Sequence, residues 1–217
     1  MIILNVAVDL DGVCSNFVKK FSTFANELYG ARCHILEDVD LVKYWDWHRW
    51  YPIKKVEEDA IWQEIIKTRD FWTSLEVFNR GQWEYFVDKI GKANNINVYF
   101  ITTRSETVGM TATRQSAIWL MNNGWKYPFV IKTKEKEKFI ENLNIEFFID
   151  DKAGNLISVK QHNPTCKVYA QEAPYNVDEL KASGIDCKRV SGLRQFTDDI
   201  LEEIYRREYN LEWKKTT

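Results

Sequence analysis

A nearly continuous apolar segment near the start of the chain ends in two aspartates. Residues 2–8 are mostly aliphatic, and Asp9-Leu10-Asp11-Gly12 follows directly. Such a segment predicts a strand buried on both faces, as in a parallel sheet, and parallel sheets bind ligands outside their carboxyl ends. Side chains two residues apart on an extended chain point the same way, so Asp9 and Asp11 can converge. A divalent cation such as Mg²⁺ is the simplest neutraliser of two carboxylates at close range.

Two later apolar segments also end in polar residues. Residues 98–101 are followed by Thr102-Thr103-Arg104, and residues 145–149 are followed by Asp150-Asp151. A lysine-rich stretch, residues 132–138, lies between them. Each feature has a simpler explanation on its own, because an aspartate after a strand can cap a helix and a threonine can merely close a strand. Their common placement at strand ends favours one shared site.

Composition narrows the class of protein. The chain has 217 residues, a net charge of −2 and a sequence pI near 6.0. It lacks the basic excess of a duplex-binding protein, so we expect a small substrate and no duplex nucleic acid. Its four cysteines show no C-x-x-C spacing, which argues against a zinc site.

The cellular setting is also an expectation from sequence. The first apolar segment has no basic region before it and no small-residue cleavage site after it, and it is too short to span a bilayer. We expect a cytoplasmic protein with reduced cysteines and no membrane partner. Monomer and homodimer both stay open.

The spacing of the apolar segments predicts an insertion. A helix is expected over residues 13–29, with Gly30 as its C-cap, but the next sheet strand begins only near Asn97. A simple crossover needs far less chain. We expect an α/β fold, a three-layer and mostly parallel (Rossmann-like) sheet flanked by helices. Residues 1–17 and 80–217 form the core, and residues 18–79 form a small helical cap. Further helices are expected near residues 53–68, 82–93, 112–123, 136–142 and 197–213, a short strand at 129–132, and a final strand at 166–170.

Aromatic side chains are concentrated in the expected cap. They are Tyr44, Trp45, Trp47, Trp50, Tyr51, Trp62, Phe71 and Trp72. A small module needs large side chains to form a core, so packing is the first explanation. The alternative is that one or two of them stack on a flat substrate.

Taken together, the order strand-DxD, strand-Thr, lysine, strand-DD resembles the haloacid dehalogenase superfamily of phosphohydrolases, from Ile2 to about Tyr175. Within that superfamily, Asp11 indicates phosphoryl transfer. Residues 69–76, with Phe71-Trp72, resemble the F-[FW]-x-x-L segment of the 5'(3')-deoxyribonucleotidases, and residues 173–176 resemble the A-P-Y-N turn of their bacterial and viral members. The P-x-P-G-A segment of that family is replaced by residues 77–81, which leaves the base preference open.

The resemblance implies a function and a set of roles. The function is Mg²⁺-dependent hydrolysis of nucleoside monophosphates, with deoxyribonucleotides as the expected substrates, through an aspartyl-phosphate. The implied catalytic residues are Asp9 as nucleophile, Asp11 as general acid and base, and Thr102 and Lys136 as phosphate contacts. The implied substrate-binding residues are Thr103, Arg104, Phe71 and Trp72. The implied metal-site residues are Asp9, Asp11, Asp151 and Asp150, with Asp150 in a supporting role.

Some alternatives stay open at this level. Lys136 is preferred because residues 133–136 resemble the T-x-x-K of the deoxyribonucleotidases, and Lys134 is second. A phosphatase of another small ester would keep every core residue and change only the cap. A catalytically silent nucleotide-binding protein and a nucleic-acid 3'-end phosphatase fit less well.

Overall fold

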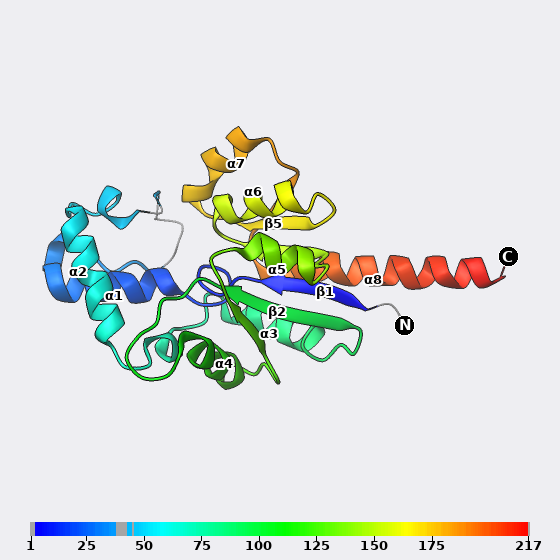
Figure 1. Ribbon diagram of the computed structural model, residues 1–217, viewed down its shortest axis with the longest axis horizontal. Helices are drawn as coiled ribbons and strands as arrows, with labels where there is room; N and C mark the ends of the chain where they lie inside the picture. Colours follow the sequence, from blue (N-terminus) through cyan, green and yellow to red (C-terminus); the bar gives the residue numbers. More distant parts are fainter. Residues whose placement is uncertain (1–2, 38–42, 45, 217) are drawn as a thin grey trace.

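Six parallel strands form one sheet in the order β3-β2-β1-β4-β5-β6 (Figure 1). The computed structural model describes residues 3–37, 43–44 and 46–216, with side chains up to residue 209. The strands are β1 (Leu4–Val8), β2 (Ile96–Thr102), β3 (Phe129–Lys132), β4 (Phe147–Asp150), β5 (Lys167–Gln171) and β6 (Cys187–Val190). Every pairing between these strands is parallel. The expected α/β fold is confirmed.

The sheet is buried on both faces because its central strands are apolar on both. On β1, Val6 and Val8 belong to one hydrophobic cluster and Ala7 belongs to the other. The same alternation places Phe147 and Phe148 of β4 in different clusters. This is the period of two that an extended chain imposes.

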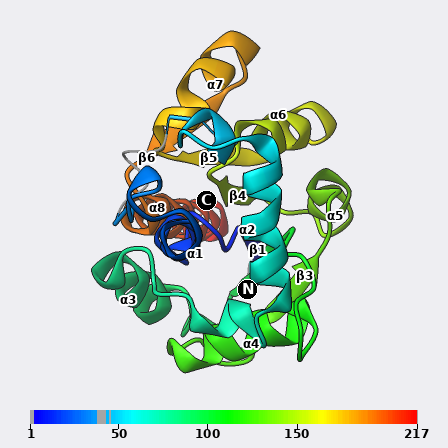
Figure 2. The ribbon, with the colours of Figure 1, turned by 90° about the vertical axis from the view of Figure 1, so that its left-hand side faces the viewer.

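Helices cover both faces. The α-helices of the described residues are α1 (Phe17–Tyr29), α2 (Lys55–Lys67), α3 (Arg80–Lys89), α4 (Ala112–Asn122), α5 (Lys136–Asn142), α6 (Ala153–His162), α7 (Val177–Ser183) and α8 (Leu193–Thr216), of which α1 and α2 belong to the insertion. Helices α3 and α8 lie on one face, and α5 and α6 lie on the other (Figure 2). Within the part of the chain that the structure describes, no helix has the length and apolar character needed to cross a bilayer.

The insertion after the first strand lies beyond one end of the sheet, where α1 and α2 stand apart from the core (Figure 1). It also contains the 3₁₀ helices η1 (Gly30–Arg32), η3 (Trp47–Arg49) and η4 (Phe71–Ser74). The two segments that lead into and out of it run side by side. Ser15 pairs with Val77 in an antiparallel bridge, and the Asn16 amide donates to the Glu76 carbonyl at 2.9 Å. Residues 18–79 stay the proposed extent of the cap. Trp45, one of its expected aromatics, lies outside the described residues.

The start of the first helix and the identity of the last strand differ from expectation, and so do the bounds of α3 and α8. The first helix begins at Phe17 rather than near residue 13, because the Asn16 side chain caps it by accepting from the Lys19 amide at 3.0 Å. Gly30 ends this helix with φ +58°, as expected. The strand at 167–171 is not the last one, since β6 follows it. Only Val190 is buried in that edge strand, so no apolar segment of the sequence indicated a strand there.

Candidate active site

The carboxyl ends of β1, β2 and β4 meet at one edge of the sheet and bring the predicted polar residues together. Asp9 directly follows β1, Thr102 is the last residue of β2, and Asp150 is the last residue of β4. The register of the strands brings these three residues together, because Val8 pairs with both Phe100 and Ile149. The site thus lies where the strand order changes direction, the place where ligands bind in open α/β sheets.

Three buried carboxylates form the centre of the site. One oxygen each from Asp9, Asp150 and Asp151 lies within 4.8 Å of the others, and all three side chains are buried. Carboxylate oxygens are hard donors of the kind Mg²⁺ and other hard cations prefer. Three of the four expected metal-site residues are therefore brought together.

Burial without enough positive charge raises the pKa values of Asp9 and Asp151. Burial, together with the nearby Asp150 and Asp11, raises the pKa of Asp9 to about 7, although Lys136 opposes the shift. Burial and the neighbouring carboxylates of Asp150 and Asp9 hold the pKa of Asp151 well above its usual range. Excess negative charge in a dry site is the condition that a bound divalent cation relieves. The donor set therefore fits Mg²⁺.

Lys136 supplies positive charge to the group of three buried carboxylates. Its ammonium contacts the Asp9 carboxylate and lies 2.6 Å from Oδ2 of Asp150. Burial lowers the pKa of Lys136, but the carboxylates of Asp150 and Asp9 raise it by more, so this pKa lies above its ordinary value. The other lysines of the stretch are exposed, with Lys132 paired to Glu106 and Lys138 to Glu135.

Asp150 is saturated by protein donors and has a supporting position. Besides Lys136, it accepts from the Lys152 amide at 2.8 Å and from the Asn155 side chain at 3.0 and 3.1 Å. Asp151 receives a hydrogen bond from the hydroxyl of Tyr175. The A-P-Y-N turn thus contributes a contact to an expected metal ligand, a role that sequence reasoning had not given to Tyr175.

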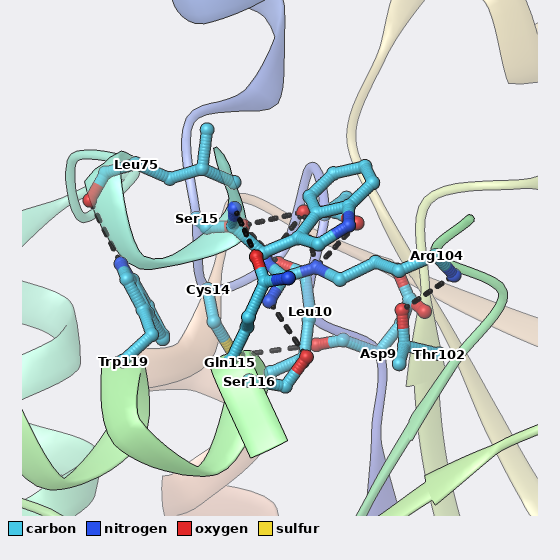
Figure 3. Close-up of polar contacts among 12 residues, drawn as sticks. Asp9, Leu10, Cys14, Ser15, Leu75, Thr102, Arg104, Gln115, Ser116 and Trp119 are labelled. Atoms are coloured by element: carbon cyan, nitrogen blue, oxygen red, sulfur yellow. Dashed lines mark hydrogen bonds and ion pairs between the residues drawn. The ribbon is translucent and has the colours of Figure 1, made fainter. Parts of the chain in front are cut away.

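The carboxylate of Asp11 stands apart from the three-acid group. It is bound by the guanidinium of Arg104, at 2.7 Å from Nη2 to Oδ1, and by the hydroxyl of Ser15 at 2.7 Å. The guanidinium, expected on phosphate, is thus directed to the carboxylate expected to act as general acid and base. The Arg104 backbone amide in turn donates to Thr102 Oγ1 at 3.3 Å (Figure 3).

A cavity of about 190 Å³ connects the acids to the cap. Its core lining includes the expected residues Asp9, Asp11, Thr102, Thr103, Arg104, Lys136 and Asp151, together with Lys152, Asn155 and Tyr175. The insertion contributes Phe17, Val18, Asp46, Trp47, Glu58, Trp62 and Trp72. Sequence reasoning placed Trp47 and Trp62 among the cap aromatics but did not single them out, because spacing alone does not show which of many aromatics faces a cavity.

The aromatic pair of the sequence motif divides between two roles. Trp72 lines the cavity, and its indole Nε1 donates to the carbonyl of Ser105 at 2.8 Å. Phe71 is fully buried, with its ring edge-on to Phe17 and Phe24, and does not line the cavity. Phe71 therefore packs beneath the cavity wall in this structure, and the expected contact with substrate is not formed by its side chain.

Comparison with known proteins agrees with this geometry. The model of the family "5' nucleotidase, deoxy (Pyrimidine), cytosolic type C protein" matches residues 1–190. The chain belongs to this family. A curated relative in Chlorobaculum tepidum, described as "Putative 5'(3')-deoxyribonucleotidase", is 21% identical over 179 residues, which cover 82% of this chain and 84% of the relative. The protein is thus a nucleotidase-family hydrolase, as its motifs indicated.

Solved structures share the fold at low identity. A "predicted phosphatase" from Clostridium acetobutylicum superposes with a TM-score of 0.55 at 14% identity, covering 93% of this chain and 100% of its own. The D,D-heptose 1,7-bisphosphate phosphatase from Burkholderia thailandensis gives 0.51 at 12% identity, covering 91% and 98%. The chain therefore shares its overall fold with these solved structures.

Proposed function

We propose that the protein hydrolyses nucleoside monophosphates, with deoxyribonucleotides as its expected substrates, in a Mg²⁺-dependent reaction. The observation that carries the proposal is the cavity itself. At one end lie Asp9 and Lys136, together with the neighbouring acids Asp150 and Asp151. The aromatic side chains of the insertion line the other part of the cavity wall. A phosphate group fits the first end, and a flat base fits the aromatic wall.

The residues can carry a two-step reaction. Asp9 attacks phosphorus in line and forms an aspartyl-phosphate as the bond to the nucleoside oxygen breaks. Asp11 gives its proton to that leaving oxygen and then takes one from the attacking water. Lys136 and the Thr102 hydroxyl stabilise charge on the phosphoryl oxygens. Bound to Asp9 and Asp151, with Asp150 in support, Mg²⁺ would neutralise the acids and the phosphate charge.

The deciding experiment measures phosphate release with Mg²⁺ from ribo- and deoxyribonucleoside monophosphates, set beside sugar phosphates. We expect turnover of deoxyribonucleotides, and a fall of at least about 1000-fold in kcat for Asp9→Asn, because the nucleophile is lost. The control is Asp186→Asn, since the Asp186 side chain is 98% exposed. Activity on sugar phosphates alone would reject the nucleotide assignment, and an active Asp9→Asn would reject the nucleophile.

A cytoplasmic location stays a prediction, and the choice between monomer and homodimer stays open. The four cysteines are free in the structure, in agreement with a reduced setting. Size-exclusion chromatography with light scattering tests the oligomeric state.

A further inference from the structure

The guanidinium of Arg104 is directed almost entirely to protein acceptors (Figure 3). Its Nε lies 3.2 and 3.0 Å from the two carboxylate oxygens of Asp11, and Nη2 lies 2.7 Å from Oδ1 of Asp11. Nη2 also donates to Ser15 Oγ at 3.0 Å, and Nη1 donates to Ser116 Oγ at 2.9 Å. Four of its five N–H groups are thus used, which leaves little capacity for a phosphate.

The Arg104 side chain is held on its other side by an aromatic ring. Its Cζ lies 4.9 Å from the ring centroid of Trp72. Trp72 is itself fixed, because its backbone amide donates to the Gln115 side chain at 2.9 Å and its indole donates to Ser105. The Arg104 side chain is fully buried, whereas that of Asp11 is 21% exposed. A buried guanidinium that lost these acceptor oxygens would be costly, so the pair keeps its geometry.

The two carboxylate oxygens of Asp11 accept different numbers of hydrogen bonds. Oδ1 accepts from Ser15 Oγ, from Nη2 and, at the longer distance, from Nε, whereas Oδ2 accepts from Nε alone. A carboxyl group that must carry a proton does so on its less occupied oxygen, because each donor already bound to an oxygen competes with the proton. The network therefore leaves Oδ2 as the oxygen of Asp11 with the fewest bound donors.

We propose that Arg104 is a positioning residue for proton transfer, acting through Asp11. Its guanidinium contacts both oxygens and fixes the carboxyl plane, with Nη2 on Oδ1 and Nε shared between Oδ1 and Oδ2. Oδ2, which has the single donor, then gives its proton to the leaving ester oxygen as the phosphorus–oxygen bond breaks. In the second step Oδ2 takes a proton from water as that water displaces Asp9 from phosphorus. The inference deepens the proposed function and rests on Asp11 as its general acid.

Such a role predicts a dependence on the leaving group. The alkoxide of a nucleoside leaves poorly without a proton, whereas 4-nitrophenolate leaves readily without one. We expect Arg104→Lys to lower kcat/KM for dUMP by about 10- to 100-fold, since lysine keeps the charge but cannot hold both oxygens. For 4-nitrophenyl phosphate, the same variant should lose less than about threefold. Arg80→Lys is the matched control, because Arg80 is exposed at the start of α3, and it should change neither value.

A double-mutant cycle separates positioning from a structural role. In an Asp11→Asn background, Arg104→Lys should cause no further loss with dUMP, because the group through which it acts is gone. If Arg104→Lys fails to fold, Ser15→Ala, which removes a donor to Oδ1, should give the same selective loss at about 3- to 10-fold.

Three results would overturn the inference. They are equal losses on both esters, a full additional loss in the Asp11→Asn background, or a raised KM for both esters with weaker inhibition by inorganic phosphate, which would make Arg104 a phosphate contact. Wild-type turnover tests the proposed function separately. If another alkyl phosphate replaced dUMP as substrate, the same ratio measured on that ester would still decide the role of Arg104.

Discussion

At the scale of single residues, the glycine at position 12 leaves room for Asp151 at the metal end of the cavity. Gly12 has φ +84°, and a Cβ atom there would collide with the carboxylate of Asp151, whose Cγ would be 2.8 Å away. We expect Gly12→Ala to displace Asp151 and to weaken Mg²⁺ binding by at least about tenfold, since ligands must be held closely in place. Isothermal titration calorimetry with Mg²⁺ measures this change.

The control for this substitution is Gly184→Ala. Gly184 also has a positive φ, +64°, but nothing lies within 4 Å of its added Cβ. Both alanines carry the backbone cost of about 1–2 kcal/mol, and only Gly12→Ala meets a carboxylate. Equal Mg²⁺ affinities in the two variants would show that Gly12 is required for its backbone conformation alone.

The sequence could single out Lys136 but could not show its partners. The T-x-x-K resemblance favoured it among four lysines, and the structure places it on Asp9 and Asp150. The partner of Arg104 was not visible in the sequence, because Asp11 lies 93 residues away along the chain. Strand motifs give the position of a side chain along the chain, whereas the direction of its hydrogen bonds depends on what packs beside it.

At the scale of elements, helix α2 carries an aromatic residue to the cavity. Trp62 is half-buried, lines the cavity and stacks on Phe17 with ring centroids 5.4 Å apart. Stacking on a base contributes about 1–3 kcal/mol. We expect Trp62→Leu to raise KM for dUMP by about tenfold and to leave KM for 2-deoxyribose 5-phosphate, which has no base, unchanged.

Helix α2 also supplies the control for this measurement. Val56 lies on the same helix and is 68% exposed, so Val56→Ala should change neither KM. If Trp62→Leu raised both constants by the same factor, the indole would act on the phosphate or on the placement of the cap, and the base would lie elsewhere.

The short helix η5 (Pro174–Asn176) holds the carboxyl ends of strands β4 and β5 in place. The buried Asn176 donates to the carbonyls of Asp151 and Gln171 at 2.7 and 2.9 Å and accepts from Arg189 at 2.6 Å. Asn176→Ala leaves these groups unpaired, so we expect the free energy of unfolding to fall by about 2–4 kcal/mol. Urea denaturation measures this value. The exposed Asn94 gives the control Asn94→Ala, and similar midpoints for the two variants would contradict the role given to the turn.

At the scale of the whole molecule, the acid cluster makes stability depend on pH. The pKa of Asp9 rises from 3.8 to about 7 on folding, mainly through burial. Between these values the folded state binds a proton that the unfolded state does not. The free energy of unfolding of metal-free protein should therefore fall as pH rises from about 4 to 7, by up to about 1.4 kcal/mol per pH unit. Thermal melting in EDTA at pH 5, 6 and 7 measures this slope.

Mg²⁺ should reverse the trend, because it binds the ionised acids. The rise in Tm on adding Mg²⁺ should be larger at pH 7.5 than at pH 5, and Asp9→Asn should reduce the slope of the metal-free protein. The ionisation of Glu203 does not affect the melting temperature between pH 5 and 7.5. Burial opposes its ionisation, but hydrogen bonds from Lys167, Arg207 and Arg206 lower its pKa to about 2, so its contribution is lost only as pH falls below 4.5. A metal-free Tm that rises from pH 5 to 7 would show that the cluster does not bind the extra protons.

The sequence by itself determined the architecture and the residue types of the site. Buried strands must be apolar on both faces, and parallel strands end at one edge, so residues 9, 102 and 150 had to meet there. Local patterns gave β3 and α5 with their observed bounds, but they missed β6, which has a single buried residue. Only the tertiary structure decided that Trp62 lines the cavity while Phe71 packs in the core, and that Arg104 holds Asp11. Packing between distant segments fixes the direction of a side chain, and no local pattern encodes that direction.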